Sequence, residues 1–278
     1  MTGLQITIDG FLGNKLKIKQ PHNGFRAGSD AVLLASAVET TGAISVLDVG
    51  CGVGTAGLCL LHRLPEATLW GLEVQPDLAE LGRENAALND LSARTHILRA
   101  DMADRTVFRK IQGPDNKPFL EAGFDHVITN PPFYEKGRAQ SAQSTTKTLA
   151  HIESNVDLAA WLQFCVARVR SKGKVTVIHR TDRLAEILSV LSGQCGSLRV
   201  IPLWPDAESS AKRVIVQALK GGKGPLELKN GLILHDGDGL PTHPAELILR
   251  HGPLLIMRRV ENTCRYRSNP YFNAHENI

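Results

Sequence analysis

Three glycines separated by single residues form the first pattern in the chain that could hold a ligand. Gly50, Gly52 and Gly54 lie between a short apolar run and a longer amphipathic stretch. A strand, a glycine turn and a helix in this order let a backbone turn sharply and approach a ligand closely. Glu73 ends the next predicted strand, 23 residues after Gly50. A carboxylate at that place can accept hydrogen bonds from the hydroxyls of a ribose.

The carboxylates near this loop indicate the charge of the ligand. Asp48 lies just before the glycines, whose spacing differs from the Gly-x-Gly-x-x-Gly of dinucleotide enzymes. Carboxylates repel a pyrophosphate and attract a cation. S-adenosylmethionine has a sulfonium and an ammonium group and no phosphate, so it is the predicted cofactor. Asp101 follows the third strand and could accept from the adenine amino group, with Met102 against the ring. Taken alone, Asp101 is better interpreted as a helix cap or turn residue.

A second pattern, Asn130-Pro131-Pro132-Phe133, comes where the fourth predicted strand ends. Two successive prolines fix the backbone and remove two donors, which leaves carbonyl groups to accept from a substrate. Asn130 adds a side-chain carbonyl group, and Phe133 adds a flat apolar surface. Parallel strands end at one edge of a sheet, so this turn and the glycine loop are expected to meet there. By itself the pattern is equally typical of a rigid turn.

The elements that must position these residues alternate along the chain. The predicted strands are 44–49, 68–72, 95–98, 125–129, 175–178, 198–203 and 213–219. The predicted helices are 55–64, 76–88, 156–170 and 183–191. This alternation predicts an α/β protein with a Rossmann-like, doubly wound fold. Its seven-stranded sheet is mostly parallel and has N-terminal and C-terminal extensions.

The chain divides into four predicted parts. An N-terminal extension, 1–43, contributes to the cofactor pocket, and 44–223 forms the main domain. An appendage follows over 224–257, with a hairpin at 232–240 and a helix near 245–250, and 258–278 is a mobile tail. Within the main domain, 104–123 is polar with two prolines and is interpreted as a surface insertion. The segment 135–155 has no apolar periodicity and is interpreted as a functional loop.

Composition excludes several classes of protein. The 278 residues are 42% apolar and 22% charged, as in an ordinary globular protein, and the net charge of +4 permits nucleic-acid binding without demanding it. Five scattered cysteines form no C-x-x-C pair and the histidines have no metal-ligand spacing, so neither a metal site nor a disulfide framework is predicted. No secretory signal and no apolar run of membrane length is visible, which predicts a cytoplasmic protein without a membrane partner.

The run LDVGCGVG, with Glu73, Asp101 and NPPF, resembles the motifs of class I S-adenosylmethionine-dependent methyltransferases that act on amino or amide nitrogens. The segment 20–34, with Gly28-Ser29-Asp30, is similar to the one before the glycine loop in bacterial tRNA(Val) adenine-N6 methyltransferases. The resemblance covers about 10–256. It implies that Ser29 and Asp30 help hold the cofactor, that Glu73 binds its ribose and Asp101 its adenine end, and that Asn130 binds the target amine.

The same resemblance implies an RNA substrate, with tRNA as the first candidate. The Asn130 Oδ1 atom and the Pro131 carbonyl group would each accept one N–H of an adenine amino group, and Phe133 would stack on the base. Protein glutamine, guanine N2 of rRNA and a small-molecule amine are alternative acceptors. A non-catalytic, cofactor-binding RNA-interaction protein is the alternative of another class. Basic residues in the loop, Lys136, Arg138 and Lys147, and arginines of the tail could meet phosphates or be solvated. No oligomeric state is predicted.

Overall fold

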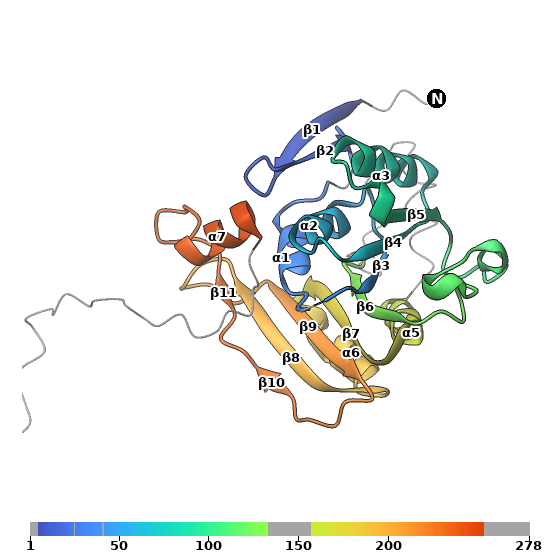
Figure 1. Ribbon diagram of the computed structural model, residues 1–278. Helices are drawn as coiled ribbons and strands as arrows, with labels where there is room; N and C mark the ends of the chain where they lie inside the picture. The colour runs from blue at the N-terminus through green and yellow to red at the C-terminus, as the bar shows by residue number, and fades with distance from the viewer. Residues whose placement is uncertain (1–4, 25, 41, 133–156, 253–278) are drawn as a thin grey trace, which may run out of the picture.

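The computed structural model describes residues 5–24, 26–40, 42–132 and 157–252, and its architecture is that of a central sheet covered by helices (Figure 1). The sheet has nine strands in the order β10-β8-β9-β7-β6-β3-β4-β5, with β11 also paired to β8. The strands are β3 Ser45–Val49, β4 Thr68–Glu73, β5 Thr95–Arg99, β6 Phe124–Thr129, β7 Val169–Arg180, β8 Cys195–Trp204, β9 Arg213–Lys220, β10 Glu227–Leu228 and β11 Leu232–Ile233.

Seven of these strands form the sheet that the sequence predicts. In chain order they lie as 3-2-1-4-5-7-6 across the sheet. The five strands β3 to β7 pair in parallel, whereas β9 runs antiparallel to both of its neighbours, β7 and β8. The predicted Rossmann-like, mostly parallel fold is therefore confirmed. The two short strands β10 and β11 extend it beyond β8, with which both pair in parallel.

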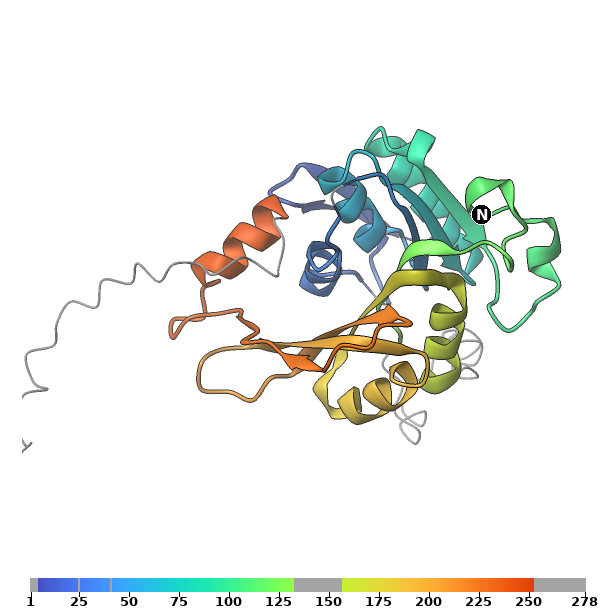
Figure 2. The same ribbon diagram turned by 60° about the horizontal axis from the view of Figure 1, so that its bottom comes forward.

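The helices cover both faces of the sheet. They are α1 Ser29–Ser36, α2 Thr55–Arg63, α3 Pro76–Leu88, α5 Leu158–Arg168, α6 Leu184–Leu191 and α7 His243–His251, with short 3₁₀ turns at Ser92–Arg94, Val107–Lys110, Pro114–Asn116 and Thr181–Arg183. The blue helices and the yellow helices lie on opposite sides of the sheet in Figure 2.

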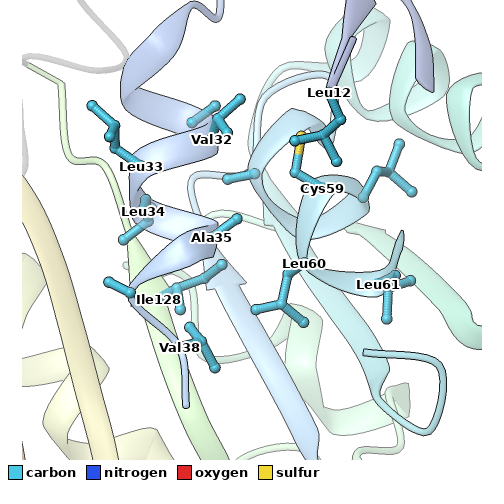
Figure 3. Packing of buried hydrophobic residues seen from close by; sticks show 14 of the residues in the cluster. Leu12, Val32, Leu33, Leu34, Ala35, Val38, Cys59, Leu60, Leu61 and Ile128 are labelled. Carbon is cyan, nitrogen blue, oxygen red and sulfur yellow. The ribbon is translucent and has the colours of Figure 1, made fainter. Parts of the chain in front are cut away.

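Successive residues of a strand point to opposite faces of the sheet, so the hydrophobic core is divided between these two faces. Ile128 of β6 packs with α1 and α2 in one hydrophobic cluster (Figure 3), and its neighbour Val127 packs with α5 and α6 in the other. This strand is buried on both faces, as is typical of a central strand in a parallel sheet.

An N-terminal hairpin stands apart from the main sheet. It consists of β1 Ile6–Phe11 and β2 Leu16–Pro21, paired antiparallel. Two asparagines one turn apart, Asn85 in α3 and Asn89 at its C-cap, bind the β2 backbone as a further strand would. Asn85 accepts from the Lys19 N–H at 2.7 Å and donates to its carbonyl oxygen at 3.0 Å. Asn89 makes the same pair of bonds to Lys17, at 2.9 and 2.8 Å.

The C-terminal appendage differs in part from the prediction. The helix predicted near 245–250 spans His243–His251, capped by Thr242, whose hydroxyl accepts from the Ala245 N–H at 3.3 Å. The hairpin predicted over 232–240 is confirmed at its turn, where the Asp236 N–H donates to the Leu240 carbonyl oxygen at 2.8 Å, but not over its full length. Leu232 and Ile233 pair with β8, and a single bridge between His235 and Pro241 encloses the turn. The predicted tail, 258–278, lies outside the described residues.

Two other sequence expectations are corrected. The segment 104–123 is not wholly a surface insertion, because Phe108 and Phe119 are buried and stack with ring centroids 4.9 Å apart. Isolated aromatic residues in a polar stretch show no periodicity that would predict their burial. The strand predicted at 175–178 begins earlier, at Val169, and is irregular near its start, where the register with β6 shifts and Lys172 has a φ of 63°.

Replacing Phe119 by alanine should test whether this segment belongs to the core. The ring is 0% exposed, so its loss should lower the free energy of unfolding by about 3–5 kcal/mol. Leu240→Ala, at a side chain that is 62% exposed, is the control and should change it by about 0.5 kcal/mol at most. Urea titrations followed by circular dichroism would measure both. Equal midpoints for the two variants would show that the segment is dispensable for stability.

Candidate functional site

The three glycines form a loop that only glycine adopts readily. Gly50, Gly52 and Gly54 have φ angles of 73°, 55° and 83°, in the left-handed region. A Cβ atom on Gly50 would come within 2.7 Å of the Trp161 ring, whereas one on Gly52 would enter open space. The loop is attached to strand β4, because the N–H groups of Gly50 and Cys51 both donate to the Leu72 carbonyl oxygen at 2.9 Å.

Glu73 lies at the predicted edge of the sheet and orders the backbone around it. Its Oε2 atom accepts from the Gly52 N–H at 2.9 Å, and its Oε1 atom accepts from the Gln75 N–H at 2.8 Å. The side chain is only 6% exposed. One carboxylate therefore holds both the glycine loop and the start of α3.

A cavity of about 500 Å³ opens above this loop, between α1, the end of β3 and the start of β9. Its volume is in the range of small-molecule sites. The predicted site residues that line it are Ser29, Asp30, Asp48, Gly50, Gly52 and Asn130. The structure thus brings together residues from the N-terminal extension, the glycine loop and the acceptor turn at Asn130.

Three buried oxygen atoms in this cavity have no hydrogen-bond partner among the described residues. They are Asp48 Oδ2, Thr55 Oγ1 and Asn130 Oδ1. A buried polar atom without a partner costs free energy unless a ligand or water completes it. These oxygen atoms can all accept, so the cavity fits a ligand that donates hydrogen bonds and carries positive charge. No phosphate group has both properties.

Asp48 has the most perturbed carboxyl group of the cavity. The pKa of Asp48 is raised from 3.8 to about 7, mainly by burial; a hydrogen bond from the Gly57 N–H opposes this shift, and the nearby charge of Glu73 adds to it. A bound cation would favour the ionised form of this carboxyl group. Near neutral pH, a cation bound in the cavity would therefore promote loss of the Asp48 proton.

The N-terminal hairpin positions the segment that leads into α1. Gln20 accepts from the Ala27 N–H at 2.8 Å and donates to Asp9 Oδ2 at 2.7 Å. Arg26 donates to the same Asp9 oxygen at 2.5 Å and to Thr7 Oγ1 at 2.9 Å. The start of α1, which lines the cavity, is thus fixed to both strands of the hairpin.

The sequence did not single out four further residues that line the cavity, namely Gln20, Arg26, Thr55 and Arg213. Arg213 lies at the start of β9, and its Nε atom is 3.2 Å from Asp30 Oδ2. Gln20 and Arg26 belong to a segment that was noted for its resemblance. No residue pattern, however, distinguished them from surface polar residues. Arg213 stands in a basic run and carried no signal of its own.

Some predicted site residues lie elsewhere. Asp101 Oδ1 accepts from the Ala103 N–H at 2.8 Å, a turn contact, and Met102 lines a separate cavity. Gly54, Glu73, Pro131 and Pro132 do not line the 500 Å³ cavity either. Phe133, the loop 135–155 and its basic residues lie outside the described residues. No cluster of histidine, cysteine or carboxylate side chains suited to a metal ion occurs in the described part of the chain.

A hydrogen-bond chain joins the two turns of the site. Trp161 Nε1 of α5 donates to Thr129 Oγ1 at 2.8 Å, and Thr129 Oγ1 donates to the Val49 carbonyl oxygen at 2.7 Å. Val49 precedes Gly50, and Thr129 precedes Asn130. The same indole that covers Gly50 therefore also fixes the strand end before the acceptor turn.

Across the described ranges, no helix has the length and apolar character needed to cross a membrane.

Comparisons with known proteins agree with this geometry. Residues 22–156 match the family model described as methyltransferase small domain. A relative from Porphyromonas gingivalis, named tRNA1(Val) (adenine(37)-N6)-methyltransferase, is 29% identical over 64% of this chain and 68% of its own. One of the same name from Trichodesmium erythraeum is 26% identical over 81% and 89%. A crystal structure titled a predicted O-methyltransferase, from Agrobacterium tumefaciens, has a TM-score of 0.64 and 27% identity over 83% of this chain and 100% of that one.

The sheet order, the glycine loop and these matches define the class of protein: the chain is an S-adenosylmethionine-dependent methyltransferase with a Rossmann-like fold. Within that class, its residues 22–156 carry the methyltransferase small domain. The cofactor is S-adenosylmethionine, and the three unpartnered oxygen atoms and open space at Gly52 fit its ammonium and sulfonium groups.

Binding of S-adenosylmethionine is expected to strengthen about tenfold between pH 5.5 and 7, because the cation favours ionised Asp48, whose pKa is about 7 in the free protein. This range lies below the ordinary pKa of an α-amino group, so the ligand stays charged. Isothermal titration calorimetry at several pH values would measure the change. Asp48→Asn, which keeps the shape and cannot titrate, is the control. The same pH slope in that variant would contradict the assignment to Asp48.

The same group also affects the stability of the free protein. Its pKa is higher in the folded protein than the ordinary 3.8, so the folded state retains the proton longer than the unfolded chain. The contribution of Asp48 to stability is complete below about pH 4 and is lost as the pH rises toward 7. Cofactor affinity and free-protein stability thus depend on this carboxyl group in opposite directions.

Proposed function

We propose that this enzyme transfers a methyl group from S-adenosylmethionine to the N6 amino group of adenine in RNA, with tRNA as the first candidate. The observation that carries the proposal is the buried, unpartnered Asn130 Oδ1 atom, which faces the cofactor cavity and is followed by two prolines. The relatives named as tRNA adenine-N6 methyltransferases support the choice of acceptor. A tRNA acceptor would place the reaction in the cytoplasm.

The cofactor is held by residues from three parts of the chain. Asp48 and Thr55 offer acceptors for the ammonium group, and Asp30 and Ser29 close the cavity from α1. Glu73 would accept from the ribose while it fixes Gly52, and Asp101 would bind at the adenine end. The bound cofactor supplies an electrophilic methyl group on a positively charged sulfur.

The acceptor turn would act by orienting the amine. An adenine amino group is a weak nucleophile because its lone pair is delocalised into the ring. Asn130 Oδ1 and the Pro131 carbonyl group would each accept one N–H, which turns the lone pair toward the methyl group. These acceptors also stabilise the positive charge that develops on the nitrogen, so positioning and electrostatics are the main contributions.

The remaining part of the proposal concerns the base. Phe133 would stack on the adenine, a contact worth about 1–3 kcal/mol in other nucleic-acid sites. A base in a duplex must first leave its stack, so an unpaired loop nucleotide is the less costly target. Glutamine side chains and guanine N2 also present two N–H groups to such a turn, and they are the acceptors against which adenine must be tested.

The test is incubation of the purified enzyme with radiolabelled S-adenosylmethionine and total tRNA from a strain that lacks the gene. Digestion to nucleosides should give labelled N6-methyladenosine. Parallel reactions with rRNA and with total protein separate the acceptor classes. Label in N2-methylguanosine, or only in protein, would contradict the proposal, although the methyltransferase assignment would stand.

A further inference from the structure

A second cavity, of about 420 Å³, lies between α5 and the segment that follows β5. It is separate from the cofactor cavity, and its size is again that of a small-molecule site. Its walls are largely apolar, with Met102, Leu120 and Phe164 among them, and its charged lining residues are Arg105 and Arg168. We call it the arginine pocket.

The charge of the arginine pocket has one sign. No aspartate or glutamate lines it, and neither arginine forms an ion pair with any described residue. By contrast, Arg183, which follows β7, is paired with Glu186 at 2.5 Å. Burial lowers the pKa of Arg168, and the nearby charge of Arg105 lowers it further. Two cations that repel each other in one pocket favour an anion between them.

Arg168 is held in a fixed orientation. Its Nη1 atom donates to the Phe119 carbonyl oxygen at 3.2 Å, and its guanidinium carbon lies 5.8 Å from the centre of the Phe164 ring. Its Nε atom is buried and has no hydrogen-bond partner among the described residues. A fixed guanidinium with an unused donor is well suited to a phosphate oxygen.

Helix α5 connects the arginine pocket to the acceptor turn. Ala160 lines it, and the next residue, Trp161, donates to Thr129, which immediately precedes Asn130. On its other side, Met102 and Ala103 belong to the turn after β5, at the same edge of the sheet. A nucleic-acid strand that presents a base at Asn130 would run along this edge of the sheet, where its neighbouring phosphates could meet the arginine pocket.

We propose that the arginine pocket binds a nucleotide of the RNA acceptor that flanks the methylated one. Its phosphodiester group pairs with Arg105 and Arg168, and its sugar and base contact the apolar walls. This inference rests on the proposed RNA substrate and adds a second subsite to it. Phosphate contacts of this kind fix the register of a strand without reading its sequence.

The test compares Arg105→Glu with Arg109→Glu. Both side chains are exposed and the two residues are four positions apart, but only Arg105 lines the arginine pocket. The same charge change at Arg109 controls for long-range electrostatics. Fluorescence anisotropy with fluorescein-labelled, unfractionated tRNA would give Kd over a range of salt concentrations. Arg105→Glu should raise Kd about tenfold or more and reduce the salt slope by about one, because one phosphate contact is lost. Arg109→Glu should change Kd by about twofold at most.

The outcomes separate this inference from the proposed function. Equal effects of the two substitutions would overturn the arginine pocket, while N6-methyladenosine formation by the unaltered enzyme would keep the proposed function. If the unaltered enzyme forms no methylated RNA, the proposed function fails, and the anisotropy measurement still decides whether the pocket binds RNA. A weaker Kd for S-adenosylmethionine in Arg105→Glu, measured by calorimetry, would overturn the inference by assigning the pocket to the cofactor.

Discussion

Methyl transfer by Asn130→Ala should be slower than that of the unaltered enzyme by about 10²–10³-fold in kcat, the usual effect of removing one preorganised electrostatic contact. The Asn130 Oδ1 atom is buried and has no hydrogen-bond partner in the described part of the chain, so removing this oxygen atom breaks no hydrogen bond there. The loss should therefore appear in the rate and scarcely in stability. Steady-state kinetics with tRNA would measure kcat, and thermal unfolding would measure stability.

Asn230→Ala is the matched control for this experiment. Asn230 is exposed in the C-terminal appendage and receives the Trp204 hydrogen bond through its backbone carbonyl group, which alanine retains. It should show unchanged kcat. If Asn130→Ala keeps kcat within about threefold of the unaltered value, the acceptor turn does not orient the amine and the mechanism proposed for it is wrong.

The second large effect is expected at Gly52. Gly52→Ala should raise the Kd for S-adenosylmethionine about 100-fold, because its Cβ atom would enter the open space of the cofactor cavity. The matched control is Gly221→Ala. Gly221 has a φ of 71° against 55° for Gly52, and a Cβ atom at either position meets nothing within 4 Å.

Both glycine substitutions should cost about 1–2 kcal/mol of stability, because each forces alanine into the left-handed region. Only Gly52→Ala should lose cofactor affinity, since Gly221 follows β9 at the opposite end of that strand from the cavity residue Arg213. Urea denaturation and calorimetry on the same two variants would separate the effects. Equal Kd values would mean that the cofactor does not approach the backbone at Gly52.

The sequence was informative wherever local chemistry determines the structure. The glycine pattern predicted a sharp backbone turn, and Gly50, Gly52 and Gly54 all have positive φ angles in such a turn. Apolar runs bounded by turn residues located the seven main strands. Phe119 was missed because it is one aromatic residue in a polar stretch, and its burial depends on Phe108 and Phe124.

The rest of the site depends on contacts between distant parts of the chain. Arg213 meets Asp30 across 183 residues, and no spacing rule connects such a pair. Asp48 was predicted as a carboxylate for a cation, but its raised pKa follows from burial, which only the folded chain creates. The arginine pocket, likewise, joins residues after β5 to residues of α5.

Asn85 has a consequence beyond anchoring the hairpin. In addition to its two bonds with Lys19, its side chain donates to the Val53 carbonyl oxygen of the glycine loop at 3.0 Å. One amide therefore joins strand β2 and the cofactor loop into the same cooperative unit. By thermodynamic reciprocity, a ligand that stabilises the loop also suppresses local opening of β2, and local opening of β2 weakens ligand binding. Through Asn85, the N-terminal hairpin contributes to the stability of the cofactor site, although Lys17 and Lys19 do not line the cofactor cavity.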